Sequence, residues 1–252
     1  MSVDHGWNRG VPEQSVSESG PMPPAAPRQQ AREVADALPA IEQQHMSAAH
    51  ALAAKLGPEV AGTVQAIASN LHAGATMSGK AAAELERLSK DDLSNPDGIR
   101  RRILELRAKT PSELKRHYDA AADGIDVLAA QLEVGALPQL AAGAEHAAAI
   151  DEVRMLLDGK TGPEAIGIMQ ELAAGADRRL AAVVAGSWGR ARLGRDETAH
   201  RSIRLLAVQA SKKFGTPSER AHADAWEALP TALKKAVGTA RFRATQRVAG
   251  GR

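Results

Sequence analysis

From residue 31 onwards, the pattern of apolar and polar positions is typical of α-helices. Runs such as 82–90 and 99–109 are built from strong helix formers, and no run of β-branched residues shows the period of two expected for a strand. The sequence therefore predicts an all-α fold of helical bundles. Glycine, proline, asparagine and aspartate divide the pattern into expected helices at 31–55, 58–73, 79–90, 97–109, 111–134, 142–157, 163–174, 177–185, 197–213, 217–228 and 231–247.

Prolines and capping residues set the expected helix ends. Thr-Pro-Ser-Glu occurs at residues 110–113 and again at 216–219, and it places a capping threonine three residues before a glutamate that can reach back to the cap. Thr-Gly-Pro-Glu at 161–164 is a near variant, and shared capping chemistry explains the recurrence without a duplicated unit. Pro39 is expected to break or kink the first helix. Loops are expected at 91–97, 135–143 and 186–196.

Residues 1–30 have the composition of a disordered arm. Five of them are proline, among Ser, Gly, Glu and Gln with little apolar surface to bury. We divide the rest of the chain by its charge into an acidic helical region at 31–160, a basic helical region at 161–230 and a basic, partially helical tail at 231–252. The change of charge falls near residues 160–176, which makes that stretch the best internal boundary.

The charge asymmetry is the strongest functional signal. Residues 176–252 contain sixteen Lys and Arg against six Asp and Glu, whereas residues 31–175 contain fourteen against twenty-one. The net charge of +2 therefore hides a balance of +10 in the first of these segments and −7 in the second. Such asymmetry indicates an anionic partner for the C-terminal part.

Composition limits the remaining classes. The chain has no cysteine, which excludes disulfides and cysteine-ligated zinc and is typical of a reducing cytosol. Its first ten residues lack the apolar segment of a secretory signal, and no stretch is apolar over the length that a spanning helix needs. We expect a cytoplasmic protein without a membrane span, for which any export would use a signal of another kind.

No catalytic or metal-binding motif is present. The eight histidines form no HExxH, and there is no GxSxG. Glu42 with His45 and Glu219 with His222 have the i, i+3 spacing of di-iron bundles, but such sites need further glutamates, and Glu219 is better explained as a capping residue. We therefore expect no enzyme, no cofactor and no metal site.

Basic residues on the predicted helix 197–213 fall on one face. Arg201, Arg204 and Lys212 lie within an arc of about 80°, opposite the apolar residues of the helix. The preceding glycine-rich stretch 186–195 is expected to be a flexible basic loop, in which Trp188 lies close to the arginines. The predicted contacts to an anionic partner are Arg190, Arg192, Arg195, Arg201, Arg204 and Lys212, with Lys234, Lys235, Arg241, Arg243 and Arg247 of the tail.

Residues 150–214 also carry a family resemblance. The stretch 153–158, then Pro163, Glu164, Ala165 and Ile168, and then Leu180, Ala181, Ala185 and Gly186 have a spacing similar to that of Bid domains. These are helical delivery modules of type IV secretion effectors and of some conjugative relaxases. The resemblance implies that residues 186–195 form a glycine-basic hook, that the basic surface docks a secretion coupling protein, and that the chain does not itself cut DNA.

Three functions are compatible with the sequence. The first is a non-enzymatic helical protein whose basic C-terminal region binds nucleic acid. The second is a Bid-like module that docks an acidic coupling protein and leads to export through a type IV system. The third is a structural or assembly protein in which the basic region packs on the acidic helices. The oligomeric state stays open.

Overall fold

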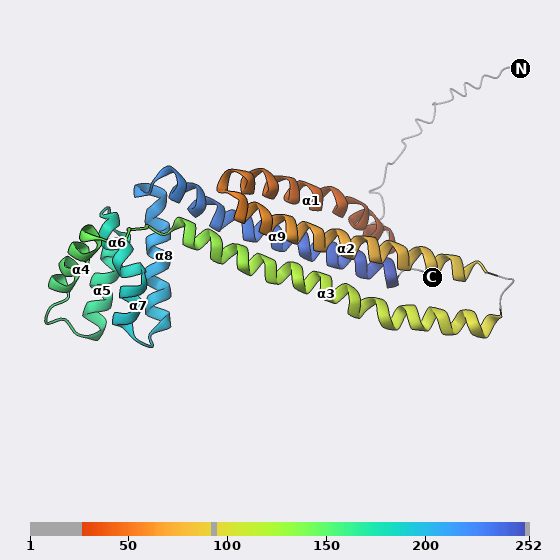
Figure 1. The fold of residues 1–252 in the computed structure, drawn as a ribbon. Helices are drawn as coiled ribbons and strands as arrows, with labels where there is room; N and C mark the ends of the chain where they lie inside the picture. Colours follow the sequence, from red (N-terminus) through yellow and green to blue (C-terminus); the bar gives the residue numbers. More distant parts are fainter. Residues whose placement is uncertain (1–26, 92–94, 250–252) are drawn as a thin grey trace, which may run out of the picture. The chain divides into compact units, whose positions relative to one another are not determined.

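A computed structural model describes residues 27–91 and 95–249, with side chains at residue 40 and from residue 42 onwards. Within these residues the chain forms nine α-helices and no strand, which confirms the all-α prediction (Figure 1). The chain divides after Asp36 into two units, and both hydrophobic cores lie in the second. The helices are α1 (Pro27–Leu56), α2 (Pro58–Ser89), α3 (Pro96–Ala136), α4 (Ala144–Leu156), α5 (Gly162–Ala174), α6 (Arg178–Ala185), α7 (Ser187–Leu193), α8 (Glu197–Phe214) and α9 (Pro217–Ala249).

The expected disordered arm lies almost entirely outside the described residues. Of residues 1–30, only 27–30 are described, and they belong to α1. Helix α1 also continues through Pro39, where a break or a kink was expected. None of the described helices combines the length and the apolarity that a membrane crossing needs.

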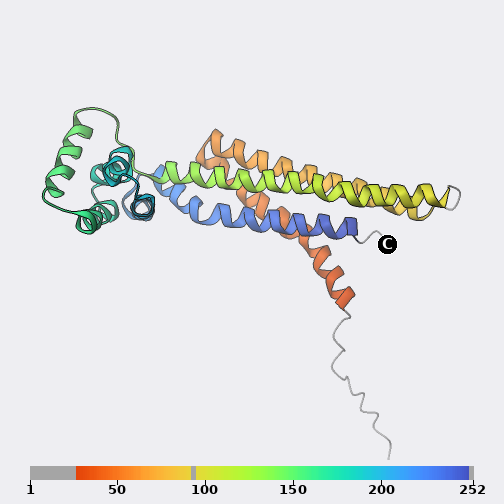
Figure 2. The ribbon, with the colours of Figure 1, turned by 90° about the horizontal axis from the view of Figure 1, so that it is seen from below.

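Long helices build the first of two hydrophobic cores. Helices α2, α3 and α9 lie side by side in both views (Figures 1 and 2), and the latter part of α1 packs on them. Their buried positions recur three and four residues apart, as the 3.6-residue period of a helix requires. The residues with the least exposed side chains in this core include Val64, Ile67, Leu71, Leu85, Leu114, Tyr118, Ile125, Leu128, Leu132, Leu229 and Leu233.

Short helices build the second core. Helices α4 to α8 contribute most of its residues, and the C-terminal end of α3 and the start of α9 supply Ala136 and Ala223. Met169 of α5, Val184 of α6 and Ile203 of α8 are fully buried there. Trp226 packs against both cores.

Three expected breaks between helices are absent. The segments 58–73 and 79–90 are one helix, α2, and Pro111 and Pro230 lie inside α3 and α9. A proline inside a helix removes one backbone hydrogen bond and costs about 3 kcal/mol. On α3 the flanking Leu114 and Tyr118 bury their side chains in the core, and this apolar burial offsets the cost.

The capping motifs have different outcomes in the structure. At 216–219 the expected capping box is confirmed, because the Thr216 N–H donates to Glu219 Oε2 at 2.9 Å and the Glu219 N–H donates to Thr216 Oγ1 at 3.2 Å. At 161–164, Thr161 precedes α5 but its side chain accepts no capping hydrogen bond. At 110–113 the prediction is wrong, because Thr110 is buried inside α3.

The glycine-rich stretch 186–195 also differs from its prediction as a flexible loop. Residues 187–193 form the short helix α7. A Cβ atom on Gly189 would lie 1.9 Å from the carbonyl oxygen of Val184, so only glycine permits this approach to α6. The glycine therefore serves close helix packing.

Residues 231–249, expected as a partially helical tail, belong to α9, which runs without interruption to Ala249. Leu233, Ala236 and Ala240 are buried on one side of this segment. Its basic residues occupy the remaining faces. This apolar face holds the segment in the first core. The distribution of its basic residues alone does not reveal the face.

We predict that alanine has opposite effects at two glycines of α2. A Cβ atom on Gly74 would lie 2.9 Å from Cζ of the buried Tyr118, whereas at Gly79 it would meet nothing within 4 Å. Gly74→Ala should therefore lower the free energy of unfolding by roughly 1–3 kcal/mol through overpacking. Gly79→Ala should raise it by about 0.5–1 kcal/mol, because alanine is the better helix former. Urea unfolding followed by circular dichroism measures both, and equal effects would contradict the packing.

Candidate nucleic-acid interface

The eleven predicted contact residues are distributed over three helices and one turn. Arg190 and Arg192 lie on α7, and Arg195 lies in the turn that follows it. Helix α8 carries Arg201, Arg204 and Lys212. The last five, Lys234, Lys235, Arg241, Arg243 and Arg247, are on α9.

Five of these residues form ion pairs within the chain. Across helices, Arg204 Nε lies 2.6 Å from Glu133 Oε1 on α3, Arg241 Nη1 lies 3.8 Å from Asp119 Oδ1, and Lys212 contacts Glu227 of α9. Arg190 pairs with Glu197 at 2.9 Å. Two of the three cations on the basic face of α8 thus hold α8 to its neighbours.

The fifth ion pair is the most buried. Arg243 Nη2 on α9 lies 2.5 Å from Glu42 Oε2 on α1, and the two side chains are only 12% and 15% exposed. Burial raises the pKa of Glu42 above its ordinary value and outweighs the attraction of Arg243 and Arg247, which acts in the opposite direction. Arg243 is therefore positioned to hold α1 and α9 together, and it is not available to an external anion.

The other predicted contacts are exposed. Arg192, Arg195 and Arg201 lie at the surface around α7 and the start of α8, and within the described chain no carboxylate lies within 4 Å of them. Lys234, Lys235 and Arg247 are likewise exposed on α9. Exposed cationic side chains without an ion pair are the groups that can neutralise the phosphates of a nucleic acid.

A hollow of about 400 Å³ concentrates positive charge beside α7. It is lined by Arg192, by Arg154 of α4, by Lys160 of the following turn and by the half-buried Trp188. Asp158 is the one carboxylate among the lining residues, so the hollow has an excess of two positive charges. Arg154 also pairs with Asp151 at 3.0 Å.

Sequence reasoning missed Arg154 and Lys160 as contact residues. Both belong to the segment assigned to the acidic region, and the summed charge of that region hides them. The signal for these contacts is a local one. Arg154 lies in the last turn of α4, and Lys160 follows it in the segment that leads to α5. Only the packing of α4 and α7 in the second core brings them beside Arg192.

The spaced Glu and His pairs have other partners. Glu42 binds Arg243, Glu219 caps α9, and His222 Nδ1 lies 2.9 Å from the carbonyl oxygen of Ser218. In the part of the chain that the structure covers, no three His, Cys, Asp or Glu side chains are grouped so as to hold a metal ion. Comparisons with protein-family models, with curated proteins and with solved structures found no match to this chain.

We predict a characteristic pH dependence for the Glu42–Arg243 pair. Because the pKa of Glu42 is raised on folding, its contribution to stability is fully present below its ordinary pKa of 4.5 and is lost as the pH rises through the folded value. Glu42→Gln cannot titrate. The free energy of unfolding of the wild type minus that of Glu42→Gln should therefore decrease from about pH 4 to about pH 7. Urea titrations at several pH values test this, and an increase would show that the attraction of Arg243 outweighs burial.

Proposed function

We propose that this protein is a non-catalytic helical protein that binds nucleic acid through the surface of α7 and the start of α8. The observation that supports the proposal best is the hollow that Arg154, Lys160 and Arg192 line together with Trp188. Exposed Arg195 and Arg201 extend the positive surface beyond it. The basic residues of α9 add a weaker, unspecific attraction.

The chemistry of this surface suits a phosphate backbone. Arginine and lysine that displace condensed counterions give affinity without base specificity, and this affinity falls steeply as salt increases. Trp188 is half-buried, and its exposed part provides an apolar plane on which a base can stack. A single aromatic plane indicates a short contact with an unpaired base and no extended single-strand platform.

The test is the binding of fluorescently labelled DNA, both duplex and single-stranded, measured by anisotropy at several salt concentrations. Replacing Lys160 and Arg192 together by alanine removes two phosphate contacts. The slope of log affinity against log salt should then fall in magnitude by about 2, and binding at low salt should weaken.

A matched variant controls for net charge. Lys55 and Lys80 are exposed on α1 and α2, and replacing both by alanine removes the same two charges from outside the hollow. This variant should retain the wild-type slope. Equal losses in both double variants would indicate unspecific attraction by net charge and would contradict the assignment to the hollow.

A Bid-like docking function is the alternative for the same surface. The resemblance of residues 150–214 supports it, and in that case the exposed arginines bind an acidic secretion coupling protein in place of phosphates. A reporter fused to the full chain tests this reading. Failure of a type IV system to translocate the reporter would contradict it.

A structural role is favoured by the ion pairs between helices. Arg204–Glu133, Arg241–Asp119 and Arg243–Glu42 join basic residues of α8 and α9 to acidic residues of α1 and α3. In this reading the charge asymmetry stabilises the bundle itself. The DNA-binding titration separates the two functions, because a purely structural role predicts no binding at low salt.

A further inference from the structure

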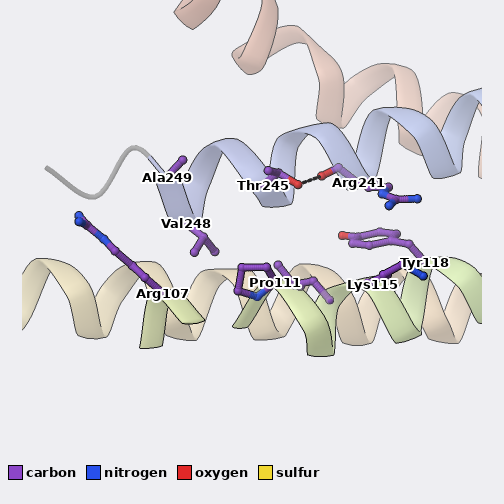
Figure 3. A pocket seen from close by; sticks show the side chains of 9 residues that line it. Arg107, Pro111, Lys115, Tyr118, Arg241, Thr245, Val248 and Ala249 are labelled. Carbon is purple, nitrogen blue, oxygen red and sulfur yellow. Dashed lines mark hydrogen bonds between the residues drawn. The ribbon is translucent and has the colours of Figure 1, made fainter. Parts of the chain in front are cut away.

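A groove between α3 and α9 lies outside the surface assigned to nucleic acid. It encloses about 540 Å³ and is lined by Arg107, Pro111, Leu114, Lys115 and Tyr118 of α3 and by Arg241, Thr245, Val248 and Ala249 of α9 (Figure 3). Its volume is in the range of small-molecule sites.

The floor of the groove is apolar. Leu114, Tyr118 and Val248 are almost fully buried and form the contact between the two helices. The same face of α3 continues through Arg107 to Leu104, because these positions recur at helical spacing. Leu104 is 67% exposed and lies on this face, on the far side of Arg107 from the floor.

Helix α9 ends where α2 and α3 continue. Figures 1 and 2 show α9 terminating alongside the middle of α3, while α2 and α3 run on towards their turn. Among the described residues, α9 therefore accompanies α3 only as far as Ala249.

The rim of the groove carries an excess of positive charge. Lys115 Nζ lies 2.5 Å from Asp119 Oδ2, and Arg241 Nη1 lies 3.8 Å from Asp119 Oδ1, so two cations share one carboxylate. Both cationic side chains are more than half exposed, at 64% and 53%. In the described part of the chain, the charged residues that line the groove are Arg107, Lys115 and Arg241, and no carboxylate lines it.

We infer that this groove binds a monomeric amphiphile with an alkyl body and a single anionic head group, namely a long-chain carboxylate. The alkyl chain lies on Leu114 and Val248, and the carboxylate is held by Lys115 and Arg241 at the rim. A carboxylate suits the rim, because a hydrogen bond between a cationic side chain and a carboxylate is about twice as strong as one between neutral groups. A nucleic acid does not suit the groove, since its phosphates would face an apolar floor.

The experiment follows the fluorescence of dansyl-labelled undecanoate added to the full chain. Binding should be saturable with one site, and dodecanoate should displace the probe. Dodecyltrimethylammonium has the same alkyl chain with a cationic head, and it should displace the probe at least about tenfold less well, since it meets repulsion at the rim. Equal displacement by the two amphiphiles would overturn the inference.

Two pairs of variants locate the site. Lys115→Ala with Arg241→Ala removes one rim cation from each helix, and it should weaken probe binding by about tenfold or more. Arg116→Ala with Lys235→Ala removes one exposed cation from each of the same helices outside the groove, and it should change binding by less than about twofold. Thr245→Phe should fill the groove and abolish binding, whereas Gln246→Phe, on the adjacent exposed position, should not.

Helical content measured by circular dichroism shows that each variant is folded. Equal losses in both alanine pairs, or absence of saturable binding to the wild type, would overturn the inference. Tighter binding to phosphatidylglycerol vesicles, lost with the same rim variant, would reassign the groove to a membrane surface and also overturn it. Lys160→Ala with Arg192→Ala, the variant that tests DNA binding, replaces no residue that lines the groove, and it should leave probe binding at the wild-type level, so this inference and the proposed function fail separately.

Discussion

The close approach of three long helices at Tyr118 is the constraint on which the first core depends. The ring of Tyr118 lies against Gly74 of α2, and its hydroxyl donates to the carbonyl oxygen of Ala240 on α9 at 3.2 Å. Burial raises the pKa of this hydroxyl, so it remains a neutral hydrogen-bond donor. Glycine is required at position 74 of α2, because a Cβ atom there would lie 2.9 Å from Cζ of the ring. The chain is rich in alanine, and here that composition sets the distance between helices.

The same packing redistributes the charge of the chain. In sequence, the C-terminal third carries a large positive balance, and all of its cations are equivalent. In the folded chain, Arg204 and Arg243 are directed towards Glu133 and Glu42 and act as links between helices. The cations left exposed are fewer, and they are grouped around α7 and along α9. The positive balance is therefore an upper limit on the charge that a partner meets.

Two surfaces of different chemistry follow from the two cores. Packing of the short helices places Arg154, Lys160 and Arg192 around a polar hollow, which suits a phosphate backbone. The contact between α3 and α9 forms an apolar floor with a cationic rim, which suits an amphiphile. Both depend on residues more than thirty positions apart in sequence, so each site exists only when its helices are packed. The two sites have no lining residue in common, so a substitution can be directed at one of them alone.

The sequence by itself determined the all-α class, the approximate positions of most helices and the capping box at 216–219, because each depends on neighbouring residues. It did not determine whether helices continue through Pro111 and Pro230, since burial of the flanking apolar faces offsets the lost hydrogen bond. It also did not show that residues 187–193 are helical. Glycine is typical of flexible loops, and the close contact of Gly189 with the backbone of Val184 exists only in the folded chain. The exposed arginines of the candidate interface could be named from sequence, but not their neighbours Arg154 and Lys160. Only the tertiary structure decided which cations face solvent, because ion pairing and burial depend on which helices meet in space.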